Sequence, residues 1–206
     1  MFLLLLLNCA LFVADHWFRI PLVKALYLSH QHPAWWQCIT CTFCHASWAH
    51  LSGNLFLLYI FGKAVEEEEG ALGVWMSYLV TGAGASAASL LLLPKTVGGA
   101  LGLGASGVVS LGASGAVFGL FVISVLVRMR WSFRKLLESF ILGQFVVERI
   151  VNEVSVASAA QGGIGAGGVN HVAHLAGALA GVLLIVGLSK LFPEGSASGD
   201  GGVATR

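Results

Sequence analysis

Long apolar runs, separated by short polar or basic segments, constrain this chain more than any other feature. A transmembrane helix needs about 20 predominantly apolar residues, and runs near that length recur along most of the 206 residues. Hydrophobic residues make up 57% of the chain and charged residues only 10%, whereas soluble domains carry roughly 25% charged residues. The sequence therefore predicts an all-α, polytopic membrane protein.

We expect six transmembrane helices in one domain over residues 1–192, followed by a disordered polar tail at 193–206. The first apolar run is short for a span, so that helix begins upstream of residue 1 or extends to Trp17. The fourth helix follows a glycine-rich segment at 98–107 and ends before Arg128. The other expected helices cover residues 2–14, 45–64, 72–93, 136–155 and 171–192.

The first loop, residues 15–49, mixes aromatic rings with cations. Its rings include Trp17, Phe18, Trp35 and Trp36. This combination is typical of the lipid headgroup region, so we expect the loop to lie on or partly in the membrane. Short loops rich in Lys and Arg mark the inner side, which places both termini inside and this loop outside.

Nucleic-acid and nucleotide binding are not predicted. The net charge of +1 provides no basic surface for a nucleic acid. Residues 102–107 fit the Gly-x-Gly-x-x-Gly dinucleotide fingerprint, but that motif requires a preceding strand and an acidic residue about 20 positions later. No Asp or Glu occurs from residue 70 to 137. We therefore expect no nucleotide and no other cofactor.

Three of the four cysteines, Cys38, Cys41 and Cys44, precede His45 at regular spacing. Four cysteines are too few for a disulfide scaffold. Three thiols and an imidazole have the chemistry of a zinc site, so a membrane metal or redox protein is one hypothesis. At the start of a helix, packing of small apolar side chains explains the cysteines better, and we predict no metal site.

Ser114 is the most conspicuous polar residue, because it stands among glycines at the head of the fourth helix. A polar side chain in a membrane helix is costly unless it is paired, which makes it a functional candidate. The best partner is His174 on the sixth helix. At a rise of 1.5 Å per residue, Ser114 would lie about 21 Å above Arg128, and His174 about 24 Å above Lys190.

The second helix adds polar residues at comparable heights. By the same rise His50 would lie roughly 20 Å above Lys63, and Asn54 about 14 Å above it, one turn deeper. A second Gly-Ala-Ser-Gly sequence contains Ser106, which would lie about 33 Å above Arg128. Ser106 is therefore predicted to be a loop serine rather than a catalytic one.

Small residues provide a way for the fourth and sixth helices to touch. They recur at three- or four-residue spacing, which lets helix backbones approach closely. A hydrogen bond between a serine and a histidine needs such an approach, because the serine side chain is short. The two seams consist of Gly112, Gly115 and Gly119 on the fourth helix and Ala173, Gly177 and Gly181 on the sixth.

Together and in this order, these residues resemble the rhomboid family of intramembrane serine proteases. The resembling motifs are His45 and His50 with Asn54, Gly112-Ala113-Ser114-Gly115, and Ala173-His174 followed by Gly177 and Gly181. The sequence of residues 30–70 looks most like the plastid rhomboids of plants and algae. One departure is Trp36-Gln37, where many members have Trp-Arg.

The resemblance implies a role for each matched residue. Ser114 would be the nucleophile and His174 its general base, while His50, Asn54 and the Ser114 backbone N–H would form the oxyanion hole. Phe118 would supply an aromatic ring against His174. Gly112, Gly115, Gly177 and Gly181 would support this arrangement. The implied substrates are transmembrane proteins within the lipid, and the implied location is the plastid envelope.

Alternatives and details of mechanism follow from the residues themselves. No Asp or Glu occurs between Glu153 and Glu194, so we expect a Ser–His dyad rather than a triad with an acid. A non-catalytic relative that binds transmembrane segments is the main alternative. The fifth helix carries a polar stripe of Gln144, Glu148 and Asn152 that lipid would reject, which favours it as the moving part for substrate entry. The alternative is that Glu148 and Arg149 extend toward the outer interface.

Overall fold

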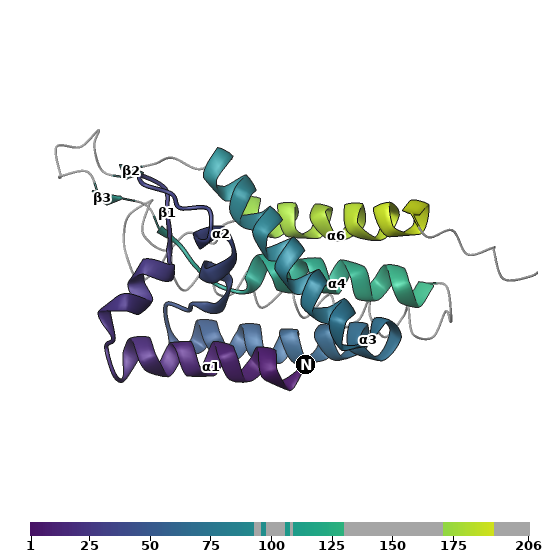
Figure 1. Cartoon of the computed structure of the whole chain (residues 1–206), viewed down its shortest axis with the longest axis horizontal. Helices are drawn as coiled ribbons and strands as arrows, with labels where there is room; N and C mark the ends of the chain where they lie inside the picture. The colour runs from purple at the N-terminus through teal and green to yellow at the C-terminus, as the bar shows by residue number, and fades with distance from the viewer. Residues whose placement is uncertain (93–95, 98–105, 108, 130–170, 192–206) are drawn as a thin grey trace, which may run out of the picture.

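The computed structural model describes residues 1–92, 96–97, 106–107, 109–129 and 171–191. Within these residues most of the chain is helical, which confirms the helical class (Figure 1). The helices are α1 (Phe2–His16), α2 (Gln37–Thr40), α3 (Trp48–Leu92), α4 (Ser114–Met129) and α6 (His171–Leu191), with 3₁₀ turns η1 (Pro21–Leu26) and η2 (Cys41–Phe43). The predicted fifth helix with its polar stripe, and the predicted tail, lie outside the described residues.

The predicted second and third helices both belong to α3, which is interrupted at Gly70. This residue has φ 76° and ψ 179°, so the helix is broken there into a first half, 48–69, and a second half, 71–92. Positive φ is readily adopted by glycine and rarely by other residues. Near the end of the first half, Lys63 Nζ lies 3.2 Å from Glu66 Oε2.

The second helix was predicted to begin at His45, and this boundary is wrong. The helix begins at Trp48, because the Ser47 hydroxyl accepts the N–H of His50 at 3.1 Å and so caps its first turn. Cys44 is extended, with φ −99° and ψ 145°. His45 therefore lies in the connection before the helix rather than in its first turn.

α4 packs against both the second half of α3 and α6 (Figure 1). The hydroxyl of Thr81 in α3 lies 2.6 Å from the Ser77 carbonyl oxygen and 3.3 Å from the Ala116 carbonyl oxygen of α4. α1 runs antiparallel to the first half of α3, since Phe2 contacts Tyr59 and Phe12 contacts Trp48.

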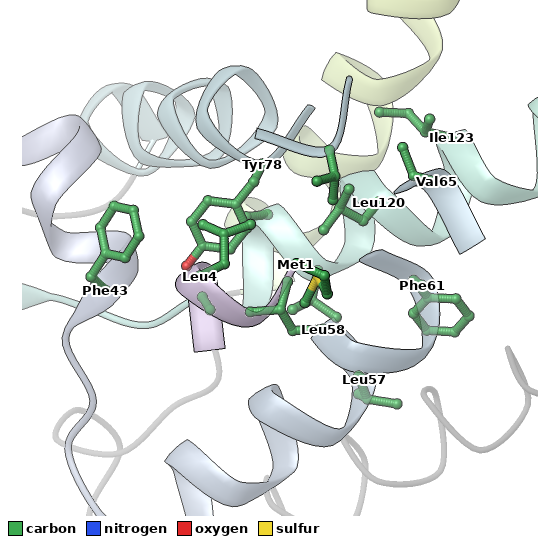
Figure 2. Close-up of a cluster of buried hydrophobic side chains, with 14 of the residues drawn as sticks. Met1, Leu4, Phe43, Leu57, Leu58, Phe61, Val65, Tyr78, Leu120 and Ile123 are labelled. Atoms are coloured by element: carbon green, nitrogen blue, oxygen red, sulfur yellow. The ribbon is translucent and has the colours of Figure 1, made fainter. Parts of the chain in front are cut away.

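A cluster of buried apolar side chains joins α1, η2, α3 and α4 (Figure 2). The Tyr78 hydroxyl inside it donates to the Thr42 carbonyl at 2.8 Å, which satisfies its hydrogen-bonding group. Phe61 and Phe121 have ring centroids 5.0 Å apart. Other members are Leu4, Leu58, Val65, Leu120 and Ile123. The cluster fixes α4 on α3, and Leu184 and Ile185 of α6 pack against it.

Two pairs of short strands lie near the end of the helices where α4 begins (Figure 1). β1 (Leu28–Ser29) pairs antiparallel with β4 (Val109–Ser110), and β2 (Thr96–Val97) with β3 (Ser106–Gly107). The strands were not predicted, because two residues are too few to show alternation of apolar and polar side chains.

Two helices in the described residues are long and apolar enough to cross a membrane, Trp48–Leu92 and Ala173–Leu191. α6 turns a stripe of apolar side chains outward, with Leu175, Leu179 and Leu183 exposed by 73, 59 and 62%. The predicted total of six spanning helices stays a prediction. The aromatic side chains of the first loop are also exposed, namely Trp17, Phe18, Trp35 and Trp36.

Candidate active site

Ser114 is the first residue of α4, and the backbone before it is closely constrained. Gly112 has φ +121°, a conformation that L side chains rarely adopt, and its N–H donates to the Cys41 carbonyl at 2.9 Å. The Ser114 side chain is half-buried. Because the first N–H groups of a helix have no intrahelical partner, the Ser114 hydroxyl lies beside backbone donors suited to an anion.

The two predicted seams of small residues do meet. A Cβ added to Gly177 would collide with the Gly115 carbonyl oxygen, and one added to Gly181 would lie 2.8 Å from the Gly119 carbonyl oxygen. The backbones of α4 and α6 are therefore in direct contact, as small residues permit. This contact brings together the first turns of the two helices, which carry the predicted nucleophile and base.

His174 is buried in the first turn of α6, with 6% of its surface exposed. Its ring stacks on Phe118, with centroids 4.6 Å apart and an interplanar angle of 8°. Phe118 stands one turn after Ser114 on α4, so the stack fixes the His174 ring against the first turns of that helix. No hydrogen bond joins Ser114 to His174 in the described part of the chain.

His50 presents a hydrogen-bond donor to the segment that leads into Ser114. The Ala46 N–H donates to His50 Nδ1 at 3.4 Å, so the neutral ring carries its proton on Nε2. The Nε2 edge faces Gly112, where an added Cβ would lie 2.6 Å from Cε1 and 2.7 Å from Nε2. Glycine at 112 thus makes room for the imidazole as well as for the positive φ.

Asn54 lies one turn after His50 and is buried. Its Nδ2 donates to the His50 carbonyl at 2.9 Å. A carboxamide nitrogen has two hydrogens, and this bond uses one of them while fixing the orientation of the amide. His50 and Asn54 therefore provide two donors from one face of the first half of α3.

His45 packs edge-on against His50, with ring centroids 5.1 Å apart. Burial, reinforced by the neighbouring His50, lowers the pKa of His45 to about 3. The ring is therefore neutral at neutral pH and adds no positive charge beside His50. Neither of its ring nitrogens has a hydrogen-bond partner among the described residues.

The cysteines of the first loop are free thiols. Burial raises the pKa of Cys41 to about 11 and of Cys44 to about 12, so both side chains are thiols rather than reactive thiolates at neutral pH. Cys41 Sγ lies 3.2 Å from Ser86 Oγ. Among the described residues, no group of three His, Cys, Asp or Glu side chains could hold a metal ion.

One polar cluster near the site was missed by the sequence analysis. His30, Ser89 and Ser110 come from three distant parts of the chain and share hydrogen bonds. The only sequence signal was a serine four residues before Ser114 and a histidine in a loop that contains several. The contact between these two residues cannot be read from the sequence, because it depends on the pairing of β1 with β4.

Comparison with known families gives a match to the Rhomboid domain over residues 32–191. The chain belongs to the rhomboid family. This match contains every residue of the candidate site and most of the described helices. The resemblance seen in the motifs is thereby confirmed, and the apolar helices fit an integral membrane protein.

Rhomboid-like proteins of Arabidopsis thaliana are similar to this rhomboid over different lengths. Rhomboid-like protein 11, chloroplastic, is 54% identical over 204 residues, which are 97% of this chain and 68% of the relative. RHOMBOID-like protein 4 is 30% identical over 152 residues, 72% of this chain and 33% of the relative. RHOMBOID-like protein 2 is 34% identical over 91 residues, 44% of this chain and 25% of the relative.

Proposed function

We propose that this rhomboid is an intramembrane serine endopeptidase that cleaves transmembrane segments of other proteins. The observation that carries the proposal is the backbone contact between α4 and α6, with the His174 ring stacked on Phe118 one turn from Ser114. The proposed domain is the six-helix bundle of residues 1–192, surrounded by lipid. Its proposed location is the plastid envelope, in line with the chloroplastic relative.

In the proposed mechanism, Ser114 Oγ attacks the carbonyl carbon of the scissile peptide bond while His174 takes the hydroxyl proton. The oxyanion that forms accepts hydrogen bonds from His50 Nε2–H, the second Nδ2–H of Asn54 and the Ser114 N–H. The C–N bond then breaks, and His174 gives its proton to the departing amine. Water hydrolyses the acyl-enzyme by the same proton transfers, and no cofactor takes part.

The test of this function is cleavage of a single transmembrane segment reconstituted with the purified protein in lipid vesicles. We expect two products whose masses sum to the mass of the substrate plus one water molecule. The cleaved peptide bond should lie inside the apolar segment. A non-catalytic binder would instead associate with the segment and leave it intact. That outcome would contradict the proposal.

Replacing His50 or Asn54 by alanine should lower kcat by roughly tens to hundreds of fold with little change in KM, because oxyanion donors act mainly in the transition state. Steady-state kinetics on the reconstituted substrate would measure both constants. Ser52→Ala is the matched control, since its hydroxyl lies on the same helix and bonds the Ala49 carbonyl. A rise in KM at normal kcat would contradict the assignment of His50 and Asn54 to the oxyanion hole.

A further inference from the structure

His30, Ser89 and Ser110 form a compact polar cluster outside the proposed catalytic machinery. His30 Nε2 lies 2.8 Å from Ser110 Oγ, and Ser89 Oγ lies 3.1 Å from Ser110 Oγ and 3.5 Å from His30 Nε2. His30 and Ser89 are each 1% exposed. Buried polar groups are costly unless hydrogen-bonded, so the three side chains stabilise one another's positions.

The cluster joins three elements that are distant in the sequence. His30 follows β1, Ser89 belongs to the last turns of α3, and Ser110 ends β4. The backbone of Ser110 is also paired with Leu28 in the β1–β4 ladder. Ser110 is therefore held through both its backbone and its side chain.

Only three residues separate Ser110 from Ser114, and that segment is held at a second point. The Gly112 N–H donates to the Cys41 carbonyl at 2.9 Å, and Gly112 packs against the His50 ring. Movement of Ser110 would therefore be transmitted to both Ser114 and the donor at His50. A misplacement of about 1 Å can cost on the order of 10²-fold in rate.

We propose that His30, Ser89 and Ser110 are positioning residues that clamp the segment 110–114 and so fix Ser114 relative to the oxyanion donors. The inference rests on the proposed peptidase function. The three residues do not touch the substrate, and no bond is made or broken on them. Their effect on catalysis is exerted through the backbone that ends at Ser114.

The test compares His30→Ala with His30→Gln, since a glutamine amide extends to about the position of the imidazole Nε2. We expect His30→Ala to lower kcat by about tenfold or more with KM unchanged, and His30→Gln to recover most of the loss. His32→Ala is the matched control, because His32 is exposed in the same loop. An unchanged kcat in His30→Ala, or a loss confined to KM, would overturn the proposal.

Hydrogen exchange of the peptide that covers residues 109–118 separates this proposal from the function on which it rests. We expect faster exchange in His30→Ala and in Ser110→Ala, with α6 unchanged. If the native protein cleaves no substrate, the proposed peptidase function is wrong, but the hydrogen-exchange rates still test the clamp. If His30→Ala does not fold, Ser110→Ala provides the test, because that substitution removes only one hydroxyl. Exchange equal to that of the native protein in a folded variant would overturn the clamp.

Discussion

Replacing Ser114 or His174 by alanine is expected to abolish cleavage of a transmembrane substrate while leaving the protein folded. Without the nucleophile no acyl-enzyme forms, and without the base the serine hydroxyl keeps its proton. The expected loss in kcat is on the order of 10⁴-fold or more. Product formation in lipid vesicles measures it, and thermal unfolding in detergent verifies the fold.

Ser106→Ala is the matched control for the serine, because Ser106 also stands in a Gly-Ala-Ser-Gly sequence. It lies in β3 rather than at the head of α4. We expect this variant to cleave at the native rate. If Ser106→Ala were inactive and Ser114→Ala active, the assignment of the nucleophile would be wrong.

Gly177→Ala is expected to cause the largest loss of stability of any single methyl added to the described helices. The new Cβ would collide with the Gly115 carbonyl oxygen, a backbone atom that cannot rotate away. α6 would have to move from α4, and overpacking of this kind costs about 1–3 kcal/mol. The same displacement would separate His174 from Ser114. We therefore expect both the cleavage activity and the midpoint temperature of thermal unfolding to fall.

Gly187→Ala provides the control on the same helix. A Cβ at Gly187 meets nothing within 4 Å, and alanine is favoured over glycine in a helix interior by about 1 kcal/mol. This variant should be as stable as the native protein or slightly more so, with normal activity. Equal stability of Gly177→Ala and Gly187→Ala would contradict the close contact of the two helices.

The contact between α4 and α6 could be predicted from the sequence because small residues recur at helical spacing on both helices. Small residues along one face of a helix are enough to let another helix come close. In the structure Gly177 lies against Gly115, and Gly181 lies against Gly119. The boundaries of α1, α4 and α6 were also close to prediction, since apolar runs end at polar or basic residues. The roles of Ser114 and His174 remain proposals.

Features that depend on distant or very short segments could not be predicted. α3 begins three residues later than predicted, because the Ser47 hydroxyl caps its first turn. The cluster of His30 and Ser110 depends on a two-residue strand pair between parts of the chain 80 residues apart. The neutrality of His45 depends on burial, which the apolar pattern around a loop residue does not reveal.

Covalent labelling with an active-site fluorophosphonate tests the central claim most directly. The Ser114 Oγ would attack phosphorus and expel fluoride, leaving a phosphonylated serine that peptide mass spectrometry locates. We predict one adduct, on Ser114, that is absent from Ser114→Ala, strongly reduced in His174→Ala and retained in Ser106→Ala. Absence of any adduct on the folded native protein, or equal labelling of Ser114→Ala, would contradict the assignment of Ser114 as an activated nucleophile.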